Sequence, residues 1–229
     1  MKTSNKILLG IFLTILILTT VVQLMVYAKY KRGEFTAFKR EEFTPMTYLP
    51  VSPARFISLK GMGNCAIKTS DTLKLEIQKD IARFVKYQTV NDTLFINDSR
   101  FTDYEMEKGT RNNGLVNIYL PAAAQLNGAY STFRIYGTSD STSAPSYTIS
   151  LKNCYLFPDN ASAYFNQLNV YSESSRIDLN RHAVFLNLNL QMTGSRLSDN
   201  SAVIRKLTMI GSDNNSSIEL SGKNVNALK

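Results

Sequence analysis

The chain has 229 residues, 44% of them hydrophobic, and a formal net charge of +8. The basic excess lies at one end, because the first 32 residues hold five Lys and Arg residues and none of the 18 acidic residues. The remainder, 33–229, has 21 basic against 18 acidic residues. A nucleic-acid partner is therefore not expected, since that class of protein needs a concentrated basic face.

An uncharged apolar segment, Ile7–Ala28, follows a short N-terminal tail, 1–6. As a helix it would be about 33 Å long at about 1.5 Å per residue, enough to cross a hydrocarbon core of about 30 Å. A buried helix of a soluble domain normally has a polar stripe, and this segment has none. We therefore predict a transmembrane helix over residues 7–28.

This segment has two conceivable fates. Residues 26–28 (Val-Tyr-Ala) could serve as the cleavage site of a secretory signal. The apolar stretch of such a signal is only about 7 to 15 residues long, however, and Lys29, Lys31 and Arg32 directly follow this site. We predict an uncleaved signal anchor, with a cleaved signal peptide and a fully exported domain as the alternative.

The flanking charges and the composition disagree about the direction of insertion. Two basic side chains precede the segment and five follow it up to Arg40, so the positive-inside rule would leave the C-terminal domain in the cytoplasm. Glu34, Glu41 and Glu42 dilute the charge on that side, and the composition of the domain favours export. We predict export, with a cytoplasmic, membrane-proximal sensor domain as the alternative.

Residues 29–53 are predicted to be a juxtamembrane connector. Pro45, Pro50 and Pro53 discourage both a helix and a central strand. Tyr27 and Tyr30 are expected at the level of the lipid headgroups, where amphipathic rings accumulate. The connector would hold the following domain away from the bilayer.

The chain beyond Pro53 has the pattern of β-structure. In the segment 73–78 apolar and polar residues alternate, which is typical of a half-buried strand with Glu76 on its polar side. No segment after Pro53 combines helical spacing with caps, so no helix is predicted there. Short strands are expected at 56–59, 73–77, 84–88, 93–96 and 115–120. The first of them is expected to end at residues 61–64, and a turn is expected at 90–92.

The C-terminal half contains a repeat of strand, small polar corner and strand. Its units begin at Leu168, Leu188 and Leu207, spaced by 20 and 19 residues. The segment 133–151 resembles an earlier unit with a loop inserted at 138–145. Such a repeat predicts a β-solenoid, in which each coil buries its apolar face against its neighbours; an antiparallel sandwich is the alternative. The predicted inward residues are Leu168, Val170, Ile177, Leu179, Leu188, Leu190, Leu197, Leu207, Met209, Ile218 and Leu220.

Candidate catalytic and metal-binding residues are few. His182 is the only histidine, and it falls in a turn between repeats. The densest carboxylates are Asp98, Asp103, Glu105 and Glu107, which lie beside Arg100 and Lys108 in a predicted loop. Paired carboxylates could perform acid and base chemistry if folding set them at a suitable separation, but a solvated charged loop is the simpler interpretation. We therefore assign no catalytic, cofactor-binding or metal-binding residue, and no cofactor.

The two cysteines and the aromatic residues leave alternatives open. Cys65 and Cys154 could form a disulfide in an oxidising compartment or could be two buried small residues. They are too few for a zinc site. Rings on a flat β face can contact sugars or proteins, but the chain lacks tryptophan. Most rings of the central part are expected at solenoid ends or under inserted loops; they are Tyr130, Phe133, Tyr136, Tyr147, Tyr155, Phe157, Tyr164, Phe165 and Tyr171.

Several segments occur in a characteristic order: the membrane segment, residues 55–67 (RFISLKGMGNCAI), Leu73–Ile77, Asn91–Ile96 and then the repeats. In this layout, residues 54–220 resemble the auto-transporter adhesin head GIN domain family of bacterial envelope proteins. The resemblance implies a right-handed β-helix-like fold, export across the inner membrane and a role in adhesion or surface binding. It implies no catalytic residues. The chain departs from the pattern at the repeat corners, where only Gly194 keeps the expected glycine.

The expected protein is all-β, with a right-handed β-helix-like solenoid over residues 54–229 preceded by one transmembrane helix. It is expected in the bacterial inner membrane, with a single pass and a periplasmic C-terminal domain. Its expected function is non-catalytic binding, adhesion or scaffolding in the envelope, with a protein or glycan partner. The alternative function is that of an envelope lyase or hydrolase acting on glycans from the same scaffold.

Overall fold

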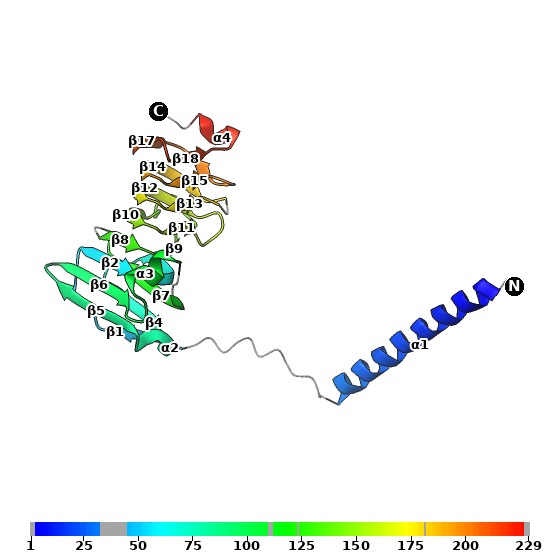
Figure 1. The fold of residues 1–229 in the computed structure, drawn as a ribbon. Coiled ribbons are helices and arrows are strands. Elements are labelled where there is room, and N and C mark those ends of the chain that lie inside the picture. Colours follow the sequence, from blue (N-terminus) through cyan, green and yellow to red (C-terminus); the bar gives the residue numbers. More distant parts are fainter. Residues whose placement is uncertain (1–2, 33–44, 110–111, 123, 181, 227–229) are drawn as a thin grey trace. The chain divides into compact units, whose positions relative to one another are not determined.

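A computed structural model describes residues 3–32, 45–109, 112–122, 124–180 and 182–226 (Figure 1). The chain divides into two compact units, residues 1–43 and 44–229. The first holds a single long helix, and the second is mostly β-structure. Each unit is described by itself below.

The helix of the first unit, α1 (Thr3–Lys31), extends beyond both ends of the predicted span 7–28. Its segment Asn5–Lys29 is long and apolar enough to cross a membrane, and none of its apolar window is buried. Length and composition would suit a signal sequence equally well. Lys2, the side chain of Tyr30 and residues 33–44 of the predicted connector lie outside the described residues.

The threonines of α1 do not interrupt its apolar surface. Thr14 donates its hydroxyl to the carbonyl of Gly10 at 2.9 Å, and Thr20 donates to the carbonyl of Leu16 at 2.7 Å. These intrahelical bonds satisfy polar groups that would otherwise be costly in hydrocarbon. The helix is therefore compatible with a lipid environment along its apolar length.

The described strands of the second unit form two sheets, each of nine strands. Sheet A contains, in spatial order, β1 (Met46–Leu49), β4 (Lys74–Gln78), β7 (Asn112–Leu120), β3 (Met62–Thr69), β9 (Thr132–Ile135), β11 (Tyr155–Pro158), β13 (Arg176–Asp178), β15 (Arg196–Ser198) and β18 (Ser217–Glu219). Sheet B contains β16 (Val203–Ile204), β14 (Val184–Thr193), β12 (Tyr164–Glu173), β10 (Ser146–Lys152), β8 (Gln125–Ala129), β2 (Phe56–Lys60), β6 (Thr93–Asp98) and β5 (Val85–Val90), and β17 (Leu207–Ser212) also pairs with β14.

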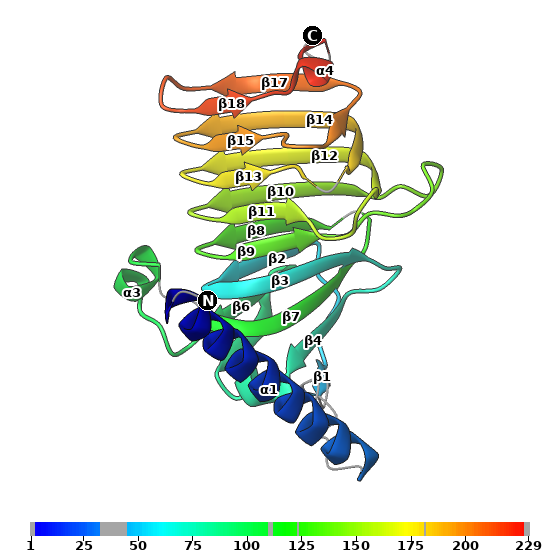
Figure 2. The ribbon, with the colours of Figure 1, turned by 90° about the vertical axis from the view of Figure 1, so that its right-hand side faces the viewer.

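In the C-terminal half, the first residues of the three predicted repeat units pair with one another. Leu168 on β12 pairs with Leu188 on β14, which pairs with Leu207 on β17. These pairings are parallel, as are the matching pairs in sheet A, so an antiparallel sandwich does not describe this region. Figure 2 shows the strands stacked in chain order from β8 and β9 to β17 and β18. The equal spacing of the repeats brings equivalent apolar residues into register.

The predicted inward residues point into the core between the sheets. Eight of the eleven are fully buried, whereas Met209, Ile218 and Leu220 are only partly buried against the core. We use coil for one strand of sheet B together with the strand of sheet A that follows it. These three residues belong to the last coil, which has a neighbouring coil on one side only. A terminal unit covers its apolar residues less completely, although Leu207 of the same coil is fully buried.

The predicted early repeat unit 133–151 is wrong. Phe133 lies on β9 of sheet A, where it pairs with Leu156. Tyr147 lies on β10 of sheet B and pairs with Leu168, so it begins the unit that precedes Leu168. The inserted loop 138–145 therefore connects two successive coils. Both strands have similar apolar patterns, and hydrophobicity alone does not tell which sheet a strand joins.

The N-terminal coils are not stacked in chain order. Strand β2 pairs with β6 on one side and with β8 on the other, and β3 lies between β7 and β9 in the same way. The second coil of the chain, with β6 and β7, therefore packs on one side of the first coil, and the third, with β8 and β9, packs on its other side. The predicted turn at 90–92 joins β5 to β6 as an antiparallel hairpin, with Asn91 and Asp92 at φ 47° and 62°.

The predicted start of the folded domain at residue 54 is too late. Strand β1 occupies Met46–Leu49, within the predicted connector, and pairs antiparallel with β4 at the edge of sheet A. Pro45 and Pro50 flank it. Proline is compatible with an edge position, because no ladder hydrogen bond is lost there. Likewise, 62–64 does not end a strand, because the chain turns at Gly61 and β3 begins at Met62.

The prediction that no helix follows Pro53 is also wrong. The described residues after Pro53 include three short helices: α2 (Lys79–Ala82), α3 (Asp103–Glu107) and α4 (Gly222–Val225). Helix α3 has a capping box, in which the Thr102 hydroxyl accepts from the Glu105 backbone and the Glu105 carboxylate accepts from the Thr102 backbone. These two reciprocal hydrogen bonds satisfy backbone donors at the start of the helix. They stabilise one helical turn although the segment has no apolar stripe.

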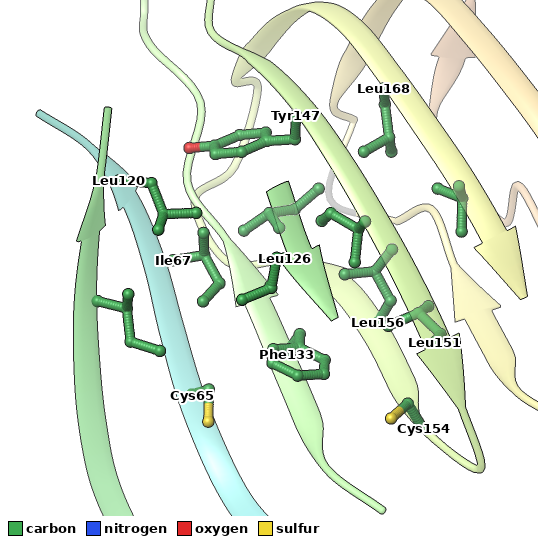
Figure 3. Close-up of a cluster of buried hydrophobic side chains, with 14 of the residues drawn as sticks. Cys65, Ile67, Leu120, Leu126, Phe133, Tyr147, Leu151, Cys154, Leu156 and Leu168 are labelled. Atoms are coloured by element: carbon green, nitrogen blue, oxygen red, sulfur yellow. The ribbon is translucent and has the colours of Figure 1, made fainter. Parts of the chain in front are cut away.

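Several central aromatic rings belong to the core itself and not to its ends. Phe133 and Phe165 are fully buried, and Phe165 stacks on Phe185 with 4.8 Å between ring centroids. Tyr147 is 4% exposed and donates its hydroxyl to the carbonyl of Tyr136. Figure 3 shows Phe133 and Tyr147 among the aliphatic side chains of both sheets. By contrast, Tyr171 is 40% exposed on sheet B.

Cys65 and Cys154 are both buried, and neither is in a disulfide. Cys65 on β3 pairs with Phe133 on β9, and β9 separates β3 from β11, which Cys154 directly precedes. Two strand spacings of about 4.8 Å separate the backbones by about 10 Å, more than the roughly 7 Å that a disulfide tolerates between Cα atoms. Figure 3 shows Phe133 between the two thiols. The disulfide alternative is therefore not realised.

Candidate functional site

The carboxylates singled out in the sequence do not converge on one site. Asp98 is buried and pairs with Arg100, 2.6 Å from carboxylate to guanidinium. Asp103 pairs with Lys60 at 2.6 Å. The Glu105 carboxylate caps its own helix, and these bonds lower its pKa. The side chain of Glu107 lies outside the described residues.

The remaining candidates are equally dispersed. His182 is exposed at a corner with φ 56°, and its backbone N–H donates to the Ser201 hydroxyl. Lys108 lies over the ring of Tyr104, 4.3 Å from its centroid. Among the described residues, no group of three or more His, Cys, Asp or Glu side chains is placed to hold a metal ion.

A hollow of about 430 Å³ lies on the outer face of sheet B. It crosses five adjacent strands, β2, β8, β10, β12 and β14. Because the strands are parallel and in register, side chains at matching positions form rows perpendicular to them. We call this feature the sheet B groove. The row along its length consists of Ser58, Asn127, Ser150, Tyr171 and Gln191.

A second row of the sheet B groove contains its charged residues. Lys152 and Glu173 pair with each other in the register, and their side chains form an ion pair at 2.8 Å. Lys60, from the same row, holds Asp103 of α3. The charged groups that the groove presents thus already have partners of opposite sign. The row contributes Lys60, Ala129, Lys152, Glu173 and Thr193.

The depth of the groove follows from the size of its side chains. Residues 58, 127, 129 and 150 are small or short, whereas Tyr171 projects beyond them. Next to the groove, a row of amides stiffens the sheet: Asn189 donates to Asn169 at 2.8 Å, and Asn169 donates to the Thr148 hydroxyl at 3.1 Å. The result is a preformed concave surface of hydroxyl, amide and aromatic groups.

A larger hollow, about 880 Å³, lies at the corners between the sheets. Its cationic side chains include Arg176 and Arg196, which form ion pairs with Asp178 and Glu219. Its lining includes two tyrosines, but Tyr130 is buried and the Tyr155 hydroxyl donates to Asp178 at 2.7 Å, whereas Tyr171 of the sheet B groove is 40% exposed. The sheet B groove is therefore the better candidate for ligand binding.

A buried carboxylate lies on the outer face of sheet A. Glu76 is 7% exposed and accepts hydrogen bonds from Asn117 at 2.9 Å and Tyr119 at 3.0 Å. Burial alone would raise the pKa of Glu76, but bonds from Tyr48, Asn117 and Tyr119, together with nearby Lys68, outweigh it and lower the pKa. Burial and this carboxylate raise the pKa of Tyr119 to about 12. The alternation pattern puts Glu76 on the polar side of the strand and does not predict its burial.

Sequence reasoning named only Tyr171 among the groove residues. The others are single Ser, Asn, Gln, Lys and Glu residues on strands that are distant in sequence. Matching positions could have been found for 171 and 191 from the 20-residue repeat, because these lie in the aligned units. Ser58 and Asn127 could not, since the N-terminal coils are stacked out of chain order.

No protein-family model matches the chain, and no curated protein matches it. A crystal structure described as a "putative lipid binding protein" from Parabacteroides distasonis is 12% identical, with 76% of this chain and 93% of that chain covered and a TM-score of 0.33. A "putative adhesin" from Bacteroides fragilis is 10% identical, with 76% and 95% covered and a TM-score of 0.33. A "putative cell adhesion protein" from Clostridium sporogenes is 12% identical, with 77% and 99% covered and a TM-score of 0.32. These similarities are too distant to assign a function.

Proposed function

We propose that the chain is a membrane-anchored, non-catalytic envelope protein that binds a partner in the sheet B groove. The observation that carries the proposal is the groove itself, a concave row of hydroxyl, amide and aromatic groups crossing five strands. Such a surface offers hydrogen bonds and an apolar contact without a reactive group. The resemblance of residues 54–220 to the adhesin head GIN domain family agrees with this role.

The scaffold that we propose is a right-handed β-helix-like solenoid. Its support is the spacing of inward residues in sheet B, where Leu126, Ile149, Val170, Leu190 and Met209 pair in succession. The intervals fall from 23 to 19 residues, a nearly constant length for one coil. A solenoid of this kind presents long faces to a partner.

The alternative, a glycan lyase or hydrolase, has less support. It would need acids held at a separation suited to catalysis, and Asp98, Asp103 and Glu105 are engaged in separate structural contacts. Incubating the full-length protein with polysaccharides and measuring new reducing ends or unsaturated products tests this alternative. Release of such products would replace the binding function with the catalytic one.

We further propose that α1 stays attached as an anchor and that the domain is exported. The native thiols are buried and unsuitable as probes, so an exposed cysteine is introduced as Ser143→Cys in the loop 138–145. In intact cells with a permeabilised outer membrane, an inner-membrane-impermeant maleimide should label it. Labelling only after the inner membrane is opened would place the domain in the cytoplasm. A membrane-free product shortened by about 28 residues would indicate a cleaved signal peptide.

Position-specific photocrosslinking tests the groove as a binding surface. A photoreactive amino acid replaces Asn127 in the groove of the full-length protein, and Ser217 on the outer face of sheet A serves as the matched control. Illumination of intact envelopes should give adducts from position 127 and few from position 217. Equal yields from both positions, or no adduct from position 127, would contradict the proposed surface.

A further inference from the structure

We infer that the sheet B groove takes an uncharged polysaccharide strand lying across the strands. The inference rests on the proposed function and deepens it by naming the ligand class. Its first support is the chemistry of the row Ser58, Asn127, Ser150 and Gln191, which offers hydroxyls and amides. Each such group can both donate and accept, as the hydroxyls of a sugar require.

The second support is the exposed ring of Tyr171. It is 40% exposed and lies in the same row, between Ser150 and Gln191. A tyrosine offers an apolar face together with a polar end, so it can contact a sugar ring while its hydroxyl stays hydrated. A single projecting ring above small neighbours gives the ligand one stacking position and hydrogen bonds on both sides of it.

The third support is the charge of the groove. Lys152 and Glu173 form an ion pair at 2.8 Å, and Lys60 is held by Asp103 at 2.6 Å. An anionic ligand would have to displace carboxylates from both lysines, and a cationic one would have to separate the first pair. An uncharged ligand leaves both pairs intact, so the groove favours it on electrostatic grounds.

The fourth support is that the backbone under the groove is fully paired. Each of β2, β8, β10, β12 and β14 has a hydrogen-bonded strand on both sides. An extended peptide therefore cannot add to the sheet here, since strand addition requires an open edge. A ligand must instead be read by side chains. The five strands cover four intervals of about 4.8 Å, roughly 19 Å in all, which suits a short stretch of a linear polymer.

Binding to immobilised polysaccharides tests the inference with the full-length protein in detergent micelles. The uncharged probes are dextran, a β-1,3-glucan and a galactomannan, and the anionic probes are polygalacturonate and heparin. We expect retention on at least one uncharged polymer, nearly unchanged when NaCl is raised from about 0.1 to about 0.3 M, since a neutral ligand feels little screening. Tyr171→Ala should weaken retention roughly tenfold, corresponding to about 1.4 kcal/mol.

Two further variants distinguish a loss of binding in the groove from a general effect of substitution. Ser150→Ile fills the hollow with a residue suited to strands and should abolish retention. Tyr48→Ala removes a ring that is 68% exposed on β1 of sheet A and should leave retention unchanged. Circular dichroism and thermal unfolding establish that each variant is folded before it is compared. A Tyr171→Ala protein that does not fold is replaced by Tyr171→Thr, which keeps a strand-forming residue.

Three results would overturn the inference. These are no retention on any uncharged polymer, retention only on the anionic polymers, and equal retention by the Tyr171 and Ser150 variants and the unchanged protein. If Asn127 then crosslinked to a protein in intact envelopes, the groove would remain a binding surface with a different ligand. If neither crosslinking nor polysaccharide binding occurred, the proposed function itself would fail.

Discussion

Phe133 occupies the space that a side chain at Gly128 would need. A Cβ atom at position 128 would lie 2.2 Å from Cε2 of Phe133 and 2.4 Å from its Cζ. Gly128 lies on β8 of sheet B and Phe133 on β9 of sheet A. The absence of a side chain on one sheet thus allows a large ring from the other to fill the core, where Phe133 is fully buried.

Gly128→Ala should therefore destabilise the domain. The added methyl group has no space unless the ring shifts, and overpacking of a core typically costs about 1–3 kcal/mol. For a domain of this size, each kcal/mol lowers Tm by roughly 2–4 °C. Thermal unfolding followed by circular dichroism measures the effect.

Two further variants test the cause of this destabilisation. Phe133→Leu removes the atoms that clash, so adding it to Gly128→Ala should cost less than the sum of the two single changes. Gly222→Ala, at a position with nothing within 4 Å of the added atom, should change the stability little. Additive costs in the double variant would show that the ring is not the obstacle.

A ladder of small polar side chains connects successive coils at one corner. The backbone N–H of Cys154 donates to the Ser175 hydroxyl at 3.0 Å, and that of Ser175 donates to the Ser195 hydroxyl at 3.1 Å. The Ser175 hydroxyl in turn donates to the carbonyl of Glu173. Cys154 occupies the same position one coil earlier, where its thiol accepts from the N–H of Ser131.

Ser175→Ala should destabilise the domain by about 1–3 kcal/mol, because it leaves the buried N–H of Cys154 without its acceptor. Cys154→Ser should cost less, since a hydroxyl can accept from the N–H of Ser131 and donate to the carbonyl of Lys152, as the thiol does. Ser143→Ala, on the exposed loop, is the matched control and should be neutral. Urea unfolding provides the comparison. A Ser175→Ala protein as stable as the control would mean that the ladder adds nothing to stability.

The C-terminal half was predictable because its pattern is local. Leu168, Leu188 and Leu207 recur after 20 and 19 residues, and the stacking of similar units makes units that are adjacent in the sequence adjacent in space. The small polar corner recurs in successive units for the same reason, and there the N–H of Ser195 donates to the hydroxyl of Ser216. In a regular repeat, the spacing of residues along the chain therefore predicts which residues pair between strands.

The N-terminal half was predictable only at the level of single strands. Most of its strands were found, but nothing in the pattern shows that β2 pairs with both β6 and β8. The alternation puts Glu76 on the polar side of its strand but does not predict its burial, because its partners Asn117 and Tyr119 are 41 and 43 residues away. The capping box of Thr102 and Glu105, by contrast, is a local signal that was visible in the sequence. The groove depends on the non-local pairings and therefore could not be assembled in advance.

The buried Glu76 should make stability depend on pH. Its pKa is lower in the folded protein than the usual value of about 4.3 for an unfolded chain. A group with a lowered pKa contributes stability above the unfolded pKa, and this contribution is lost as the pH falls through the folded pKa. The unchanged protein should therefore lose more stability between about pH 6 and pH 3.5 than Glu76→Gln does, as measured by urea midpoints.

The comparison of the two proteins isolates Glu76 from other carboxylates with lowered pKa values, such as Glu105 and Asp213. These groups titrate equally in both proteins and cancel in the difference. Asp71→Asn, at an exposed carboxylate, is the control and should follow the unchanged protein at every pH. Parallel pH profiles for Glu76→Gln and the unchanged protein would contradict a stabilising role of the ionised carboxylate.

The two thiols should be unreactive in the folded protein. Cys65 is fully buried and Cys154 is 5% exposed. Burial, followed by the neighbouring Cys154, raises the pKa of the Cys65 thiol, so the reactive thiolate is scarce as well as inaccessible. Alkylation then requires unfolding or local opening and should be about a thousandfold or more slower than at an exposed cysteine. Ser143→Cys supplies that exposed reference in the same chain.

Intact mass spectrometry after alkylation should show one modification natively in this variant and three in urea, with or without reductant. A native protein that resists alkylation in urea until it is reduced would instead contain a disulfide, which the intervening strand β9 does not allow.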